Sequence, residues 1–182
     1  MLRPGVFGAL VSHSGDSQFE YCYMPDIASA ARALRYEYEG SYTSFWESFR
    51  SGPAFLRSSD HALLNVYAMA ACYSARPDGE PDLPFDPSSG RVREAVWERW
   101  LAMDPVRMVG AHVEALQSLT GIYLDAGRRD EAYLDLGTLA VAAELDAAGI
   151  EHYLELFEGG HSRIEYRYPL GWRFLVERIA TR

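Results

Sequence analysis

The chain has 182 residues, of which 48% are hydrophobic and 24% charged, as is typical of a soluble globular protein with one core. Its formal net charge of −9 argues against nucleic acid or an anionic membrane as a partner. The apolar run at residues 6–11 is too short for a signal peptide, and no run is long enough to span a bilayer. We therefore predict a cytoplasmic protein.

The first predicted strand covers residues 6–12. This run is continuously apolar and rich in small and β-branched residues, and it ends at a loop that begins His13, Ser14, Gly15, Asp16. Continuous apolar runs are typical of buried parallel strands. We expect the loop to lie at the edge of the sheet where active-site residues gather.

The middle of the chain, residues 25–119, is predicted to be a helical insertion between two parts of one domain, residues 1–24 and 120–182. A loop at residues 76–90 holds four prolines and two glycines. Four residues stand where helix N-caps are expected: Asp26, Ser41, Asp60 and Asp104.

The insertion is rich in aromatic side chains that could line a substrate pocket. The one-turn spacing of Phe45, Trp46 and Phe49 instead favours packing of the insertion onto the sheet, because amphipathic spacing usually marks a core. The aromatic residues concerned are Tyr36, Tyr38, Tyr42, Phe45, Trp46, Phe49, Trp97 and Trp100.

Residues 120–162 show a strand, loop, helix, strand, loop pattern. The apolar run at 121–125 and the short alternating run at 153–157 each end in a glycine-containing loop, and an alanine- and leucine-rich helical run lies between them. Such a βαβ pattern predicts parallel strands that end at the same edge of the sheet. Asp130 and His161, one in each loop, are therefore expected side by side.

An aspartate beside a histidine is suited to proton transfer. A carboxylate bonded to one imidazole nitrogen fixes the tautomer, so that the other nitrogen can act as a general base. We predict Asp130 as the acid and His161 as the base, with Asp125 and Glu131 as alternatives for the acid. The structural alternatives are that Asp130 caps the following helix and that His161 is an ordinary turn residue.

The two loops resemble a known family. GIYLDAGRRDE at 121–131 and ELFEGGHS at 155–162 resemble the last two active-site loops of α/β-hydrolase esterases, in the group that includes enterochelin esterase-like proteins. Residues 3–23 resemble the segment after the nucleophile helix of that family. The resemblance implies the C-terminal part of an α/β-hydrolase fold, with about three parallel strands, flanking helices and a lid-like insertion. It also implies Asp130 as acid and His161 as base.

The family places its serine nucleophile in a G-x-S-x-G elbow, and this sequence contains none. By the resemblance, that elbow would lie before Met1, and the chain would be a truncated serine esterase with little or no activity alone. Residues 12–16, Ser-His-Ser-Gly-Asp, are similar to an elbow but lack its two flanking glycines. Ser14 is thus a second possibility for the nucleophile. The favoured interpretation is that this loop lines the substrate pocket with Asp16, Glu20 or Tyr21.

No cofactor or metal is expected. No histidine pair has a ligand spacing such as H-E-x-x-H, and Cys22 and Cys72 do not have the spacing of metal ligands. Cys22 has no histidine motif beside it, which argues against a cysteine nucleophile.

Three functions therefore remain open. The resemblance favours hydrolysis of a small carboxylic ester. The alternatives are a non-catalytic module that binds an acyl ligand or a partner, and an active enzyme that uses Ser14. In each case the first strand would leave an unpaired apolar edge, which favours a homo-oligomer or docking of a missing N-terminal segment. A final amphipathic helix at 169–180 is expected to cover the sheet with Leu170, Phe174, Leu175 and Ile179.

Overall fold

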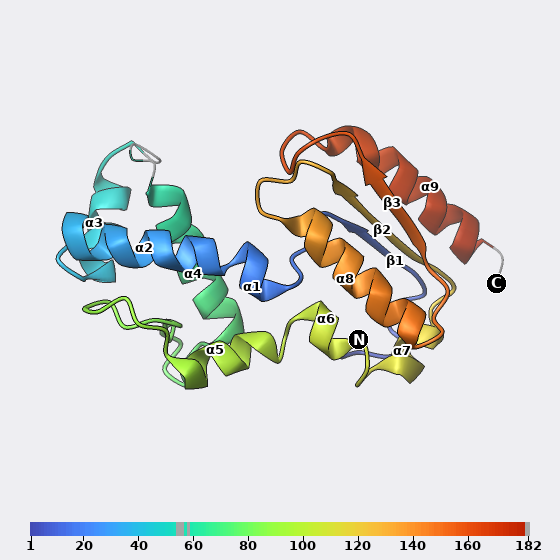
Figure 1. Ribbon diagram of the computed structural model, residues 1–182, viewed down its shortest axis with the longest axis horizontal. Coiled ribbons are helices and arrows are strands. Elements are labelled where there is room, and N and C mark those ends of the chain that lie inside the picture. The colour runs from blue at the N-terminus through green and yellow to red at the C-terminus, as the bar shows by residue number, and fades with distance from the viewer. Residues whose placement is uncertain (54–56, 58, 181–182) are drawn as a thin grey trace. The chain divides into compact units, whose positions relative to one another are not determined.

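The computed structural model describes residues 1–53, 57 and 59–180 (Figure 1). The chain divides into two compact units. The sheet unit contains Met1–Cys22 and Asp104–Arg182, and the helical unit contains Tyr23–Met103. The helical unit thus ends earlier than the predicted insertion. Residues 54–56 and 58 of that insertion lie outside the described residues.

The helical unit contains four helices in its described part: α2 (Met24–Glu37), α3 (Tyr42–Ser51), α4 (Asp60–Tyr73) and α5 (Glu94–Leu101). Ser41 caps α3, as predicted, by accepting a hydrogen bond from the Ser44 N–H at 3.2 Å. Asp26 and Asp60 were expected to be caps as well. This prediction is wrong, because both lie inside the first turn of their helices.

Aromatic side chains form much of the core of the helical unit. Phe45 and Trp100 are fully buried, and the Trp46 ring stacks on the rings of Phe49 and Tyr67. Tyr36 and Trp46 are exceptions, since they are 78% and 39% exposed. The ring contacts of Phe45, Trp46 and Phe49 join helices of this unit to one another, and packing of these rings onto the sheet stays a prediction.

The sheet unit is built on three parallel strands, and the fold is mixed α/β as predicted. β1 (Leu10–His13), β2 (Ile122–Gly127) and β3 (Tyr153–Phe157) lie in the order β1-β2-β3. His13 is paired in register with Asp125, and Asp125 with Glu155. β1 is shorter than predicted, because residues 6–9 do not form a strand.

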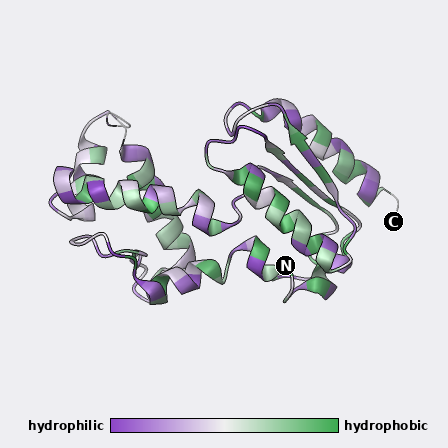
Figure 2. Cartoon of the chain, in the orientation of Figure 1, coloured by the Kyte–Doolittle hydropathy of each residue, from purple (hydrophilic) through white to green (hydrophobic). Residues whose placement is uncertain are grey.

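Helices cover both faces of the sheet (Figure 1). α8 (Leu134–Ala147) lies on one face, where it packs on β2 together with α6 (Pro105–Met108) and α7 (Val113–Gln117). α6 is capped as predicted, because Asp104 accepts a hydrogen bond from Val106 N–H. The core on this face is apolar. In Figure 2, green hydrophobic residues alternate along α8 with paler and purple ones. The buried residues of this core are Val109, Leu116, Ile122, Leu124, Val141, Ala142, Leu145 and Ile150.

The last helix, α9 (Tyr168–Ile179), follows the short 3-10 helix η1 (Glu165–Arg167) and covers the other face. Its Phe174 ring contacts the Tyr123 ring with centroids 5.4 Å apart. Leu170 and Ile179 are exposed, so the prediction that they cover the sheet is wrong. Gly171 is the buried residue of α9, and it lies one turn before Phe174, so both residues are on the face of α9 that meets the sheet. Leu170 is on a different face of the helix and points away from the sheet. Of the helices that are described, none is both long and apolar enough to cross a membrane.

β1 lies at the edge of the sheet and bonds only to β2 among the described strands. Residues 4–12 carry no charged side chain, and Leu10 is 39% exposed. Unprotected apolar edge strands promote pairing with another chain. We expect concentration-dependent association, measured by sedimentation velocity, and we expect Leu10→Lys to reduce it. Leu136→Lys on α8, at a site 44% exposed, is the matched control. A monomer with a cooperative melt that does not change with concentration would contradict this prediction.

Candidate active site

The loop after β2, residues 128–133, holds Asp130 in one orientation. The Asp130 N–H donates to the Gly127 carbonyl oxygen at 3.1 Å, and its Oδ1 accepts from the Ala132 N–H at 2.9 Å. The side chain is fully buried. Helix α8 begins only at Leu134, with Tyr133 as its N-cap residue. Asp130 is therefore not a cap of that helix, and its second carboxylate oxygen, Oδ2, remains for another partner.

The loop after β3, residues 158–163, is joined to the Asp130 loop by the main chain. The Arg128 N–H donates to the Phe157 carbonyl oxygen and the Arg129 N–H to that of Gly159, each at 2.9 Å. A Cβ atom at Gly127 would lie 2.6 Å from the Gly159 carbonyl oxygen and 2.7 Å from that of Gly160. Glycine at 127 is thus required for the two loops to approach so closely.

These loops bring Asp130 and His161 together. His161 Nδ1 lies 3.2 Å from Asp130 Oδ2. The Asp130 side chain is 0% exposed and the His161 side chain 47% exposed, so the carboxylate is held inside while the ring reaches the surface. Within the part of the chain that the structure describes, His161 Nε2 makes no hydrogen bond. This is the arrangement in which a carboxylate fixes the imidazole tautomer and leaves Nε2 able to accept a proton.

Glu131, an alternative for the acid, contacts His161 differently. Its Oε2 accepts a hydrogen bond from the His161 main-chain N–H at 2.7 Å, so it bonds the backbone and not the ring. That N–H holds the pKa of the Glu131 carboxyl below its usual value.

Asp125, the other alternative, lies in a separate group on the α9 face of the sheet. Its Oδ1 is 2.8 Å from His13 Nδ1, and its Oδ2 accepts from Arg167 Nε at 3.0 Å. It therefore orients His13, and not His161. The Tyr168 ring of α9 lies 5.5 Å from the His13 ring, centroid to centroid, and His13 is 14% exposed.

The group around Asp125 spans all three strands. Arg167 also donates to Glu155 Oε2 at 2.5 Å and to the Tyr123 hydroxyl oxygen at 3.0 Å. Burial and the nearby Asp125 carboxylate raise the pKa of Tyr123, which therefore remains a neutral phenol. This group was not predicted from the sequence. Its signal was Asp125 inside an otherwise apolar strand, with polar residues in register on both sides, His13 on β1 and Glu155 on β3.

Ser14 follows β1 directly, at the same edge of the sheet as Asp130 and His161. It has the left-handed φ of +45°, which is unfavourable for a residue other than glycine. The residue is 4% exposed, and its Oγ is buried without a hydrogen-bond partner in the described structure. A nucleophile must reach the carbonyl carbon of its substrate. As placed, Ser14 does not present its oxygen to one.

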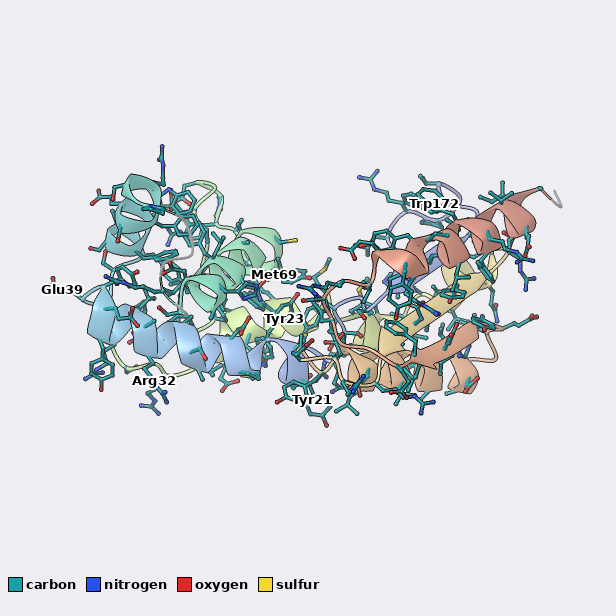
Figure 3. All side chains as sticks on the ribbon, turned by 90° about the horizontal axis from the view of Figure 1, so that it is seen from above. Tyr21, Tyr23, Arg32, Glu39, Met69 and Trp172 are labelled. Carbon is teal, nitrogen blue, oxygen red and sulfur yellow. The ribbon has the colours of Figure 1, made fainter. Side chains whose placement is uncertain are left out.

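The residues predicted to line a substrate pocket have different positions. A cavity of about 410 Å³ lies beside β1, lined mainly by apolar groups together with Ser12, Gly15 and Asp16. Glu20 forms an ion pair with Arg107 instead. Tyr21 points outward from helix α1 (Phe19–Cys22) (Figure 3). Of the three predicted residues, the structure therefore places only Asp16 on this cavity.

The cysteines are both free thiols. Burial raises the pKa of Cys22 to about 12, so the thiol remains protonated at neutral pH. Across the described ranges, no three His, Cys, Asp or Glu side chains are grouped so that they could hold a metal ion.

No protein-family model matches this chain, and no curated protein matches it either. The esterase resemblance therefore depends on the loop residues themselves. The contact between the buried Asp130 carboxylate and the exposed His161 imidazole is observed independently of that resemblance.

Proposed function

We propose that Asp130 and His161 are the acid and base of a serine esterase of the α/β-hydrolase type, acting on a small carboxylic ester. The observation that supports this most directly is the 3.2 Å contact between His161 Nδ1 and the buried Asp130 Oδ2. A parallel sheet with helices on both faces, and with these loops at the carboxyl ends of its strands, is compatible with that fold.

In the proposed reaction a serine hydroxyl attacks the acyl carbon while His161 Nε2 removes its proton. Main-chain N–H groups stabilise the oxyanion that forms. The protonated His161 then gives the proton to the departing alcohol, which leaves an acyl-serine. Water attacks this ester in the second half of the reaction, and His161 again removes and returns a proton. Asp130 keeps the Nδ1 proton in place through both halves.

The serine is proposed to come from a segment outside these 182 residues. The sequence has no G-x-S-x-G, and Ser14, the serine that directly follows β1, has a buried hydroxyl. A chain that lacks the nucleophile retains only the reactivity of an oriented imidazole. This reactivity is enough for a test with an activated ester.

Binding of an acyl ligand without turnover is the second candidate function. The observation in its favour is the largely apolar cavity of about 410 Å³ beside β1, which is within the usual size range of ligand pockets. A protein of this kind would bind an acyl compound, but His161 would not affect ester hydrolysis.

The test is release of p-nitrophenolate from p-nitrophenyl acetate by the purified chain, compared with His161→Ala, Ser14→Ala and His61→Ala. We expect His161→Ala to lower the rate to that of buffer, because Nε2 of this imidazole is oriented and exposed. His61→Ala, which removes another exposed imidazole, is expected to leave the rate unchanged. Equal rates for the parent and His161→Ala would overturn the proposal.

A fluorophosphonate probe read by mass spectrometry identifies the serine. We expect no label on Ser14 and no loss of rate in Ser14→Ala. Label on Ser14, with loss of turnover in both Ser14→Ala and His161→Ala, would instead make this chain a complete small esterase and would refute an external nucleophile.

A further inference from the structure

The Glu131 side chain lies against the main chain of the His161 loop. One carboxylate oxygen, Oε2, accepts from the His161 N–H at 2.7 Å. The other, Oε1, lies 2.7 Å from the position that a Cβ atom at residue 160 would occupy. Any side chain at position 160 would therefore push this carboxylate away, and Gly160 allows the contact.

His161 is thus held at two points by consecutive residues. Asp130 contacts the ring at Nδ1, and Glu131 contacts the backbone N–H of the same residue. The His161 side chain is about half exposed, so few packing contacts can fix it. Its position depends mainly on these two polar contacts and on the bond from the Arg129 N–H to the Gly159 carbonyl oxygen.

We propose that Glu131 is a positioning residue, which holds the main chain of His161 so that the ring stays on Asp130 with Nε2 directed outward. The catalytic purpose of this contact rests on the proposed function, but the contact itself can be tested without any turnover. The inference assigns separate tasks to two adjacent carboxylates. Asp130 orients the ring, while Glu131 orients the loop.

The charge of Glu131 strengthens this contact. Because the His161 N–H lowers the pKa of this carboxyl from its usual value, Glu131 is ionised at neutral pH. Hydrogen bonds to an ionised acceptor are stronger than those between neutral groups. The contact is therefore strongest above the normal carboxyl pKa, and it weakens as the pH falls through the lowered pKa of the folded state, where only a neutral oxygen remains as acceptor.

The experiment compares Glu131→Ala, Glu131→Gln and Glu158→Ala by NMR. Glu158 is the matched control, because it is an exposed carboxylate in the same loop that pairs with Arg128. We expect the His161 amide to exchange with solvent about tenfold faster in Glu131→Ala, since its acceptor is lost. Glutamine keeps an oxygen acceptor but loses the charge, so exchange in Glu131→Gln is expected to lie between that of the parent and that of Glu131→Ala. Equal exchange in the parent and Glu131→Ala, or an equal rise in Glu158→Ala, would overturn the proposal.

Ester hydrolysis gives a second measurement. If His161 is the base, Glu131→Ala should lower kcat with little change in KM, and Glu131→Gln should restore kcat. If the proposed function is wrong, the amide exchange still changes while hydrolysis does not, so the two failures are distinguishable. A thermal melt of each variant checks that the fold is retained. An equal loss of kcat in Glu131→Gln and Glu131→Ala would show that charge, and not the hydrogen bond, matters, which would refute the positioning role.

Discussion

Replacing Asp130 with asparagine is expected to reverse the tautomer of neutral His161. Asp130 Oδ1 already accepts from the Ala132 N–H, so an asparagine would keep its carbonyl oxygen there and turn its NH2 group toward His161 Nδ1. Nδ1 would then have to accept a hydrogen bond, and the ring proton would move to Nε2. A protonated Nε2 cannot act as a base.

The 15N chemical shifts of the His161 ring, recorded at a pH where the imidazole is neutral, measure this change directly. His161-dependent ester hydrolysis should fall to the His161→Ala background; in serine proteases the corresponding change costs about 10⁴ in kcat. The control is Glu158→Gln, which removes a charge from the same loop and should alter neither measurement. Retention of the Nδ1–H tautomer in Asp130→Asn would contradict the role assigned to Asp130.

Replacing Arg167 with methionine is expected to cause the largest loss of stability. The Arg167 side chain is 8% exposed and donates hydrogen bonds to Asp125 and Glu155. Burial acts to lower the pKa of Arg167, but the hydrogen bonds to Glu155 and Asp125 outweigh burial and raise it above normal. Loss of the cation leaves the buried Asp125 carboxylate without its strongest partner. Breaking a buried ion pair in this way costs about 3–5 kcal/mol in the free energy of unfolding.

Urea unfolding of Arg167→Met, Arg167→Lys and Arg173→Met tests this expectation. Arg173 also pairs with a carboxylate, Glu177, but its side chain is 76% exposed, so water replaces the lost contact. We expect the order of stability loss to be Arg167→Met, then Arg167→Lys, then Arg173→Met with almost none. If Arg167→Met were as stable as Arg173→Met, the group around Asp125 would not be an important source of stability.

The sequence predicted the sheet and the contact between Asp130 and His161 because both follow from local patterns. Each strand is a short apolar run, and each loop has the glycines that its geometry requires, as at Gly127 and Gly160. The βαβ rule then places both loops at one edge. The apolar run of β1 predicted a strand, but its place beside β2 was implied only by the family resemblance.

Other features depend on contacts that no local pattern specifies. The ion pair of Arg167 with Asp125 requires the orientation of η1 over the sheet, which periodicity does not give. The burial of Ser14 depends on its positive φ, and a Ser-Gly sequence does not determine the sign of φ. The sequence predicted that Leu170 faces the sheet, but Leu170 is exposed and the adjacent Gly171 is buried there. Glycine gives no hydrophobic signal, so the pattern did not indicate this contact.

The pairing of β1 with β2 has a consequence for synthesis on the ribosome. His13 and Asp125, which bond across these strands, are 112 residues apart in sequence. At the usual rate of about 5–20 residues per second, roughly 6 to 22 seconds pass between translation of the two. During that time β1 lacks β2, the strand with which it pairs in the described structure, whereas β2, α8 and β3 emerge in immediate succession. The apolar residues of β1 therefore wait several seconds for their partner strand, and we expect chaperones to bind this segment until β2 has been translated.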